Sequence, residues 1–132
     1  MNRVLLDTNA WLWIAADDDQ LGPSARSLIL RADTELVLSA VSAWEISMKW
    51  ALGKLPLPEA PGQFVETTVR DGGLKRLTID FEHVIGVAKL PPIHNDPFDR
   101  LVIAQSIATG MPLLTGHDTV SPCGVATIDA RR

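Results

Sequence analysis

Val4-Leu5-Leu6-Asp7-Thr8-Asn9 is the stretch that decides the fold of this chain. Its first half has the apolar composition of a buried strand, and residues 10–16 have the composition of a helix. Asp7 would then lie at the carboxyl end of a strand, which is where open α/β sheets bind their ligands. The same position also suits a helix cap, because an Asp side chain accepts hydrogen bonds from the first amides of a helix. The other acidic residues have to decide between these two interpretations.

The composition is that of one compact domain. With 132 residues, of which 46% are hydrophobic, the chain is long enough for one core and short for two, so we expect a single domain over residues 1–132. No apolar run approaches the roughly 18 residues of a membrane helix, and we expect neither a leader segment nor a membrane association. The single cysteine, Cys123, forms no internal disulfide. We therefore expect a cytoplasmic protein.

The net charge argues against simple attraction to a polyanion. Sixteen acidic residues against twelve basic ones give a formal charge of −4. That argument weakens if several acids gather to hold metal cations, because bound cations reverse the sign of the local charge.

Turn residues and hydrophobic periodicity divide the chain into alternating strands and helices. After the first strand, the predicted strands are residues 35–38, 74–79, 111–115 and 125–128. After residues 10–16, the predicted helices are residues 23–32, 39–52, 63–70, 80–90 and 97–109. Alternation requires crossover connections, so we expect a three-layer α/β/α sandwich around a mainly parallel sheet.

The helix predicted over residues 80–90 carries one apolar face. Its members recur at helical spacing and are Phe81, Val84, Ile85 and Ala88. This spacing predicts that the four side chains face the core and that His83 lies to the side.

Acidic residues recur where the carboxyl ends of the strands would meet. Asp7 follows the first strand, Asp96 and Asp99 begin a helix, and the turn Thr115–Asp118 follows a later strand. Asp96 also suits a helix N-cap, and Asp99 falls in the first turn, where the positive end of the helix dipole favours an anion. The sequence therefore predicts that several carboxylates converge at one edge of the sheet.

Glu45 has three possible roles at this stage. Ser42-x-x-Glu45 fits a capping box, and Lys49, four residues on, makes a surface ion pair possible. If the helix begins earlier, at Ser39 or Ala40, Glu45 lies beyond the first turn and can join the other acids.

Converging carboxylates favour metal-dependent chemistry. Close carboxylates repel one another unless they hold protons or bind a cation, and the hard ions Mg²⁺ and Mn²⁺ prefer such oxygen ligands. Such ions activate water and stabilise the charges that develop in phosphodiester hydrolysis. The chain has no Gly-x-Ser-x-Gly elbow, no phosphate-binding glycine loop and no paired-histidine zinc motif.

Three motifs carry a family resemblance. They are Asp7-Thr8-Asn9, Ser42-Ala-Trp-Glu45-Ile and His94-Asn-Asp96-Pro-Phe-Asp99-Arg100-Leu-Val-Ile-Ala-Gln105. In order and spacing they resemble the PIN-domain superfamily, specifically the VapC-like toxins of bacterial toxin–antitoxin pairs, from Val4 to about Ile128. The resemblance implies a PIN-like fold, a Mg²⁺- or Mn²⁺-dependent endoribonuclease with an RNA substrate, a cognate antitoxin that inserts a segment near the active site, and a homodimer.

The resemblance also implies roles for individual residues. The core acids, which would bind metal or orient the attacking water, are Asp7, Glu45 and Asp99. Asp96 would be an accessory acid or a helix cap. The hydrogen-bonding or phosphate-contacting neighbours would be Asn9, Thr115 and Arg100.

One position departs from the family pattern. The family usually has Thr-x-Asp after the penultimate strand, whereas this chain has Thr115-Gly116-His117-Asp118. Either the turn shifts Asp118 into the metal site, or His117 takes that place, or the site has three strong acids. We favour Asp118 as the fourth metal ligand, because Gly116 gives the turn the freedom to shift.

Two other functions remain open. The missing Thr-x-Asp motif and the acidic net charge are compatible with a catalytically weak PIN-like module that binds RNA or a protein. A phosphotransfer domain with Asp7 as the nucleophile ranks third, because such domains usually carry Asp-x-Asp and Asn9 replaces the second acid.

Overall fold

The computed structural model describes residues 2–92, 95–116 and 126–132. Its strands are β1 (Asn2–Leu6), β2 (Thr34–Ser39), β3 (Lys75–Leu77), β4 (Leu113–Thr115) and β5 (Thr127–Asp129). Its helices are α1 (Thr8–Ala16), α2 (Pro23–Leu30), α3 (Ala40–Ala51), α4 (Pro61–Gly72), α5 (Phe81–Gly86) and α6 (Pro97–Thr109), with a 3-10 turn η1 (Val87–Lys89). His94, His117, Asp118 and Cys123 lie outside the described residues.

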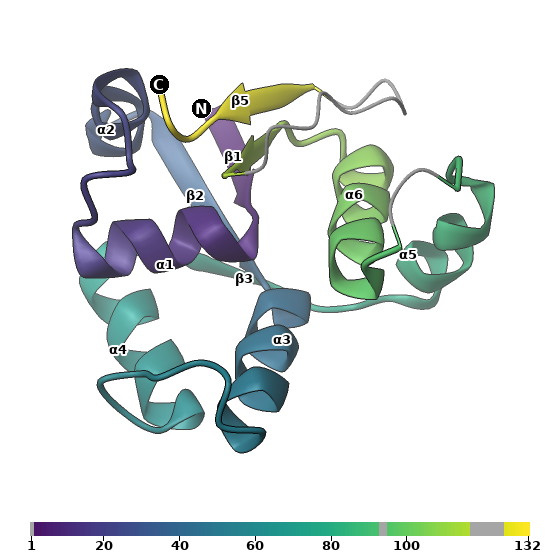
Figure 1. Cartoon of the computed structure of the whole chain (residues 1–132). Coiled ribbons are helices and arrows are strands. Elements are labelled where there is room, and N and C mark those ends of the chain that lie inside the picture. Colours follow the sequence, from purple (N-terminus) through teal and green to yellow (C-terminus); the bar gives the residue numbers. More distant parts are fainter. Residues whose placement is uncertain (1, 93–94, 117–125) are drawn as a thin grey trace.

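The strands form one parallel sheet in the order β3-β2-β1-β4-β5. On the central strand β1, Leu5 pairs with Val37 of β2 and with Leu113 of β4. Because all pairs are parallel, the carboxyl ends of the strands lie at one edge of the sheet (Figure 1). Asp7 directly follows β1 at this edge, and Thr115 is the last residue of β4.

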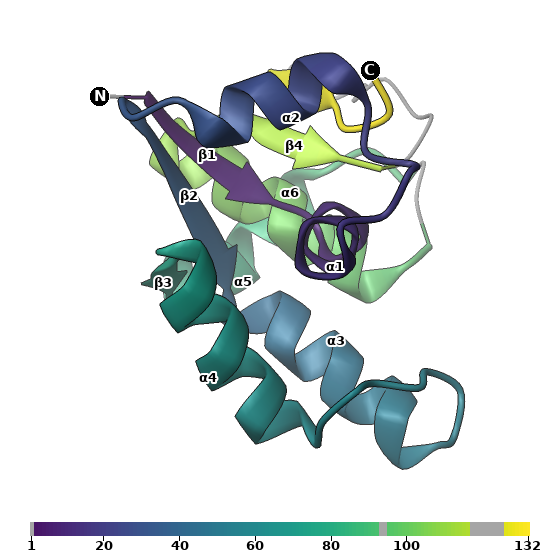
Figure 2. The same cartoon turned by 90° about the vertical axis from the view of Figure 1, so that its left-hand side faces the viewer.

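Helices cover both faces of the sheet, which confirms the predicted α/β/α sandwich. Val4 and Leu6 of β1 belong to a core that also holds Trp11 of α1 and Phe64 of α4. Leu5, which points to the other face, belongs to a second core that includes residues 101–103 of α6. Figure 2 looks onto the face covered by α1, α2 and α4, with α5 and α6 behind the sheet. Burial on both faces explains why the sequence of β1 ends in an unbroken apolar run.

The start of α3 settles one of the open interpretations of Glu45. Ser39 is the N-cap, and its hydroxyl accepts a hydrogen bond from the amide of Val41 at 3.0 Å. The helix therefore begins at Ala40, and Ser42 is already inside it. The capping-box interpretation of Ser42 and Glu45 is wrong, because Glu45 lies beyond the first turn.

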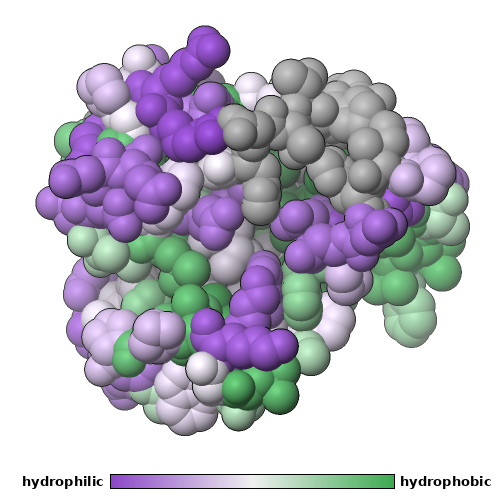
Figure 3. All heavy atoms as spheres, viewed as in Figure 1, coloured by the Kyte–Doolittle hydropathy of each residue, from purple (hydrophilic) through white to green (hydrophobic). Residues whose placement is uncertain are grey.

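The predicted core face of α5 is wrong. Phe81 is 89% exposed, and Val84 and Ile85 are exposed as well, whereas His83 is buried. His83 Nδ1 accepts a hydrogen bond from the amide of Asp80 and lies 3.2 Å from Gln105 Nε2 in the interior. The apolar face of α5 therefore points outward, and Figure 3 shows hydrophobic atoms gathered at the right-hand edge, where α5 lies.

Within the described part of the chain, none of the helices is long and apolar enough to cross a bilayer.

Candidate active site

Asp7 ties three elements together at the carboxyl edge of the sheet. Its side chain is buried, and Oδ1 accepts a hydrogen bond from the amide of Ala10 at 2.7 Å, which caps α1. Oδ2 accepts from the hydroxyl of Thr115 at 2.7 Å and from the amide of Gly116 at 3.0 Å, both at the end of β4. The two interpretations of Asp7 are thus compatible, since one carboxylate is both a helix cap and a side chain at the ligand-binding edge.

Glu45 lies on α3 with its carboxylate buried, and each of its oxygens has a partner. The hydroxyl of Thr8, the residue next to Asp7, donates to Oε1 at 2.6 Å and lies 2.9 Å from Ser42 Oγ. The ammonium of Lys49 donates to Oε2 in an ion pair between successive turns of α3. Thr8 therefore connects the Asp7 end of α1 to Glu45.

Negative charges from α6 also act on Lys49. The hydrogen bond that Lys49 donates to Glu45 raises the pKa of Lys49 above its ordinary value, although burial of the ammonium lowers it. The charges of Glu45, Asp96 and Asp99 raise this pKa further. Lys49 is therefore a charged ammonium among carboxylates that come from two helices.

The start of α6 carries Asp96 and Asp99, the other predicted site acids within the described residues. Asp96 is the N-cap, and its Oδ1 accepts from the amides of Phe98 at 2.8 Å and of Asp99 at 3.1 Å. Phe98 packs edge-on against Trp44 of α3, with ring centroids 4.6 Å apart. This contact brings the first turn of α6, which carries Asp99, against the helix that carries Glu45.

Arg100 is engaged with backbone carbonyls in the preceding loop. Its guanidinium donates to Pro91 at 2.8 Å, to Val87 at 3.1 Å and to Leu90 at 3.3 Å. These carbonyls belong to η1 and to the segment that follows it. Arg100 thus holds this loop against the first turn of α6.

Gly116 is needed for a close approach of the chain. A Cβ at this position would lie 2.8 Å from the ring of Trp13 and 2.9 Å from the Cβ of Asn9. The reason for glycine is therefore space beside α1, because its φ is not in the left-handed region. Asn9 therefore packs beside the turn in which the amide of Gly116 donates to Asp7. His117 and Asp118 lie outside the described residues.

The donor chemistry fits a hard divalent ion, since the acids supply carboxylate oxygens only. In the arrangement seen, however, no three Asp, Glu, His or Cys side chains among the described residues lie close enough together to hold a metal ion. In this arrangement Asp7 accepts hydrogen bonds from Thr115 and Gly116, and Glu45 accepts them from Thr8 and Lys49.

The sequence alone missed two members of this network. In the sequence, Thr8 stands out only as the middle residue of the Asp7-Thr8-Asn9 motif, and Lys49 only as a surface partner of Glu45. Their spacing carried a signal in each case: Thr8 adjoins Asp7, and Lys49 lies one turn after Glu45 on the same face of α3. Neither signal reveals that the shared carboxylate is buried.

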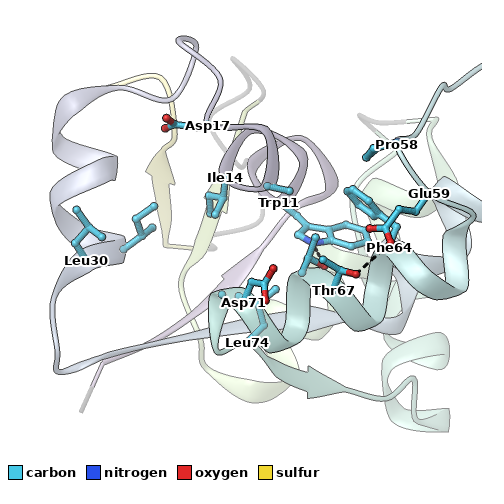
Figure 4. Close-up of a pocket in the computed structure, with 14 residues that line it drawn as sticks. Trp11, Ile14, Asp17, Leu30, Pro58, Glu59, Phe64, Thr67, Asp71 and Leu74 are labelled. Carbon is cyan, nitrogen blue, oxygen red and sulfur yellow. Dashed lines mark hydrogen bonds between the residues drawn. The ribbon is translucent and has the colours of Figure 1, made fainter.

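A groove lies beside this site, between α1, α2 and α4 (Figure 4). It measures about 440 Å³, and Trp11 and Phe64 form part of its apolar wall, with ring centroids 5.4 Å apart. Its lining includes three acidic residues, which are Asp17, Glu59 and Asp71, and no Lys or Arg among the described residues. The lining of the groove is thus largely apolar and carries negative charge.

Comparisons with known proteins agree with this fold. The profile of the PIN domain family matches residues 4–120, and the chain belongs to this family. Over 58 residues the chain is 38% identical to a protein named Ribonuclease VapC16 from Mycobacterium tuberculosis (strain ATCC 25618 / H37Rv). That match covers 44% of this chain and 41% of the length of the relative.

Solved structures match over almost the whole chain. VapBC2 from Rickettsia felis, bound to a promoter DNA fragment, gives a TM-score of 0.71 at 13% sequence identity. The alignment covers 96% of this chain and 97% of the matched chain. DNA-bound VapBC from Salmonella typhimurium gives a TM-score of 0.68 at 16% identity and covers 98% of both chains. At such low identity these matches establish the fold alone, which is the α/β/α fold of PIN domains.

Replacing Gly116 with Ala tests the close approach beside Asp7. The new Cβ pushes the turn away from α1 and lengthens the bond from the amide to Asp7. We expect a loss of about 1–3 kcal/mol in the free energy of unfolding, measured by urea denaturation. Gly62→Ala is the matched control, because no atom lies within 4 Å of its new Cβ. A Gly116→Ala variant as stable as Gly62→Ala would contradict the packing described.

Proposed function

We propose that this chain is a metal-dependent endoribonuclease that cleaves RNA in the cytoplasm as the toxin of a toxin–antitoxin pair. The observation that carries the proposal is the set of acids at the carboxyl edge of the sheet. Asp7 and Glu45 are connected through Thr8, and the charges of Asp96 and Asp99 reach Lys49 beside Glu45. The VapC ribonuclease relative and the toxin–antitoxin complexes with this fold support the reaction class and the biological role.

In this proposal Asp7, Glu45 and Asp99 hold Mg²⁺ or Mn²⁺, with Asp118 as the fourth ligand. Such an ion, when bound, supplies a Lewis acid for the phosphodiester and an acidified water as the nucleophile. Hard oxygen ligands suit both ions. The expected substrate is single-stranded or looped RNA, because its unstacked bases are accessible to side chains of the protein.

The neighbours of the acids keep them in place for this reaction. Thr115 fixes one oxygen of Asp7 by a hydrogen bond, and Thr8 does the same for Glu45. Asp96 binds the first amides of α6 and so keeps the turn that carries Asp99 in helical form. These bonds reduce the number of rotamers that a metal-bound site would have to order.

The antitoxin is proposed to dock in the groove between α1, α2 and α4. The Trp11 and Phe64 wall suits an apolar helix face, and the acidic lining suits Lys or Arg beside that face. Trp11 lies one turn beyond the Asp7 cap on α1, so a segment bound in the groove contacts the helix that carries the site. We therefore expect an amphipathic segment with a basic rim.

The homodimer is proposed to form through the outward face of α5. Phe81, Val84 and Ile85 are exposed there, and a shallow groove beside them includes Glu82 and Lys89. A two-fold interface places the same patch of both copies in contact, so a patch with one acid and one base can pair with itself. An exposed apolar face rimmed by opposite charges fits a second copy of this chain.

The nuclease proposal is tested with purified protein, freed of any antitoxin, and a single-stranded RNA. Cleavage is expected with Mg²⁺ or Mn²⁺ and not with EDTA. Asp7→Asn and Asp99→Asn should each lower kcat/KM by about a hundredfold or more, because each removes an ionised ligand. Asp33→Asn is the control, because this exposed acid directly precedes β2 and so lies at the opposite edge of the sheet.

Two other outcomes would point elsewhere. RNA binding without cleavage would support the binding module, and cleavage that survives EDTA would contradict metal dependence. Thermal melts of each variant separate lost chemistry from lost folding, since Asp7 also caps α1.

The groove is tested with two synthetic helical peptides of about 15 residues that share one leucine face. One peptide carries lysines beside that face and the other glutamates. The basic peptide is expected to bind at least about tenfold more tightly by fluorescence anisotropy. The preference should disappear in a Glu59→Lys, Asp71→Lys variant. Equal binding of both peptides to the unmodified protein would argue against this surface.

The α5 face is tested by the mass of the protein in solution. Light scattering should give a dimer of two 14.3-kDa chains, and Phe81→Ser should give a monomer of unchanged secondary structure. Leu52→Ser, which changes an exposed leucine after α3, is the control and should stay dimeric. A Phe81→Ser dimer would show that the copies meet elsewhere.

A further inference from the structure

Lys49 brings a positive charge to the acid site, and the nuclease mechanism does not explain its place there. Its ammonium binds Oε2 of Glu45, one turn earlier on α3. The Lys49 side chain is 44% exposed, whereas that of Glu45 is only 8% exposed. The lysine thus covers the carboxylate from the solvent side.

This pair differs from an ordinary surface ion pair. Two solvated charges on a helix gain little from their contact, because water screens both of them. Glu45 is removed from water, so its negative charge needs a cation or a set of hydrogen-bond donors. Thr8 supplies one donor, and Lys49 supplies the only positive charge that the described structure places on this carboxylate.

The position of Lys49 also conflicts with metal binding at Glu45. A divalent ion bound at Oε2 would lie close to the ammonium, and two cations at that separation repel strongly. One of the expected ligands already has a cation.

We propose that Lys49 is the internal counter-ion of the acid site, and that a divalent ion binds Glu45 only by displacing the Lys49 ammonium from Oε2. The proposal rests on the proposed metal-dependent function. In the protein without metal, Lys49 neutralises the buried carboxylate of Glu45. When metal binds, the exposed side chain of Lys49 turns outward, where it meets the approaching phosphate backbone of the RNA.

The competition has a consequence that does not involve activity. Removing the ammonium should leave Glu45 without its counter-ion, so the metal-free protein loses stability. The same change should strengthen metal binding, because the ion no longer has to displace a bound cation. If Lys49 had a merely structural role, its removal would lower the stability of the metal-free protein without strengthening metal binding.

The experiment compares Lys49→Met with the unmodified protein, in the absence of RNA. Methionine keeps the length of the side chain and removes its charge. Titration calorimetry with Mn²⁺ should show a Kd at least about tenfold lower in Lys49→Met. The melting temperature in EDTA should fall by about 3–6 °C and recover when Mn²⁺ is added. Lys54→Met, at an exposed lysine just after α3, should change neither quantity.

A second variant distinguishes the loss of the counter-ion from a general failure to fold. Glu45→Gln with Lys49→Met removes both charges of the pair and should restore the melting temperature in EDTA. Mn²⁺ affinity that is unchanged or weaker in Lys49→Met, or no binding to either protein, would overturn the proposal. Loss of RNA cleavage is a separate result: if Lys49→Met binds Mn²⁺ more tightly but RNA is never cleaved, the nuclease proposal fails and the role of Lys49 stands.

Discussion

The carboxylate of Asp7 is the point on which the structure of the site depends. It caps α1 through Ala10 and accepts two hydrogen bonds from the end of β4. A buried carboxylate is costly unless its oxygens are bonded, and here each of them accepts at least one hydrogen bond. The end of β4, which is distant in the sequence, therefore has to meet the junction of β1 and α1 at Asp7 for the charge to be tolerated. The position of the edge where a ligand would bind is fixed by the same requirement.

The second constraint is the burial of Glu45 beside that edge. Its carboxylate connects α1 to α3 through Thr8 and needs a positive charge from Lys49. The acids of α6 add negative charge around the same ammonium. A site built in this way concentrates negative charge around one ammonium, in a chain whose formal charge is −4.

Apolar residues at helical spacing do not face the interior of this protein in every helix. In α5 the apolar spacing is clear, yet Phe81 is exposed and His83 is buried. His83 is held by the amide of Asp80 and lies beside Gln105, which is itself buried and accepts from Ser39 at 2.5 Å. Periodicity shows that a face is apolar, but it cannot show whether that face packs inside its own chain or against another molecule.

The sequence by itself determined the order of strands and helices along the chain and the parallel sheet, and it predicted that Asp7, Asp96 and Asp99 gather at one edge. These features depend on local composition and on the rule that parallel strands need crossovers. Only the tertiary structure decided that α3 begins at Ala40, that Glu45 is buried against Thr8 and Lys49, and that α5 turns its apolar face outward. The physical reason is that burial and ion pairing are relations between distant segments. A spacing in one segment cannot specify them.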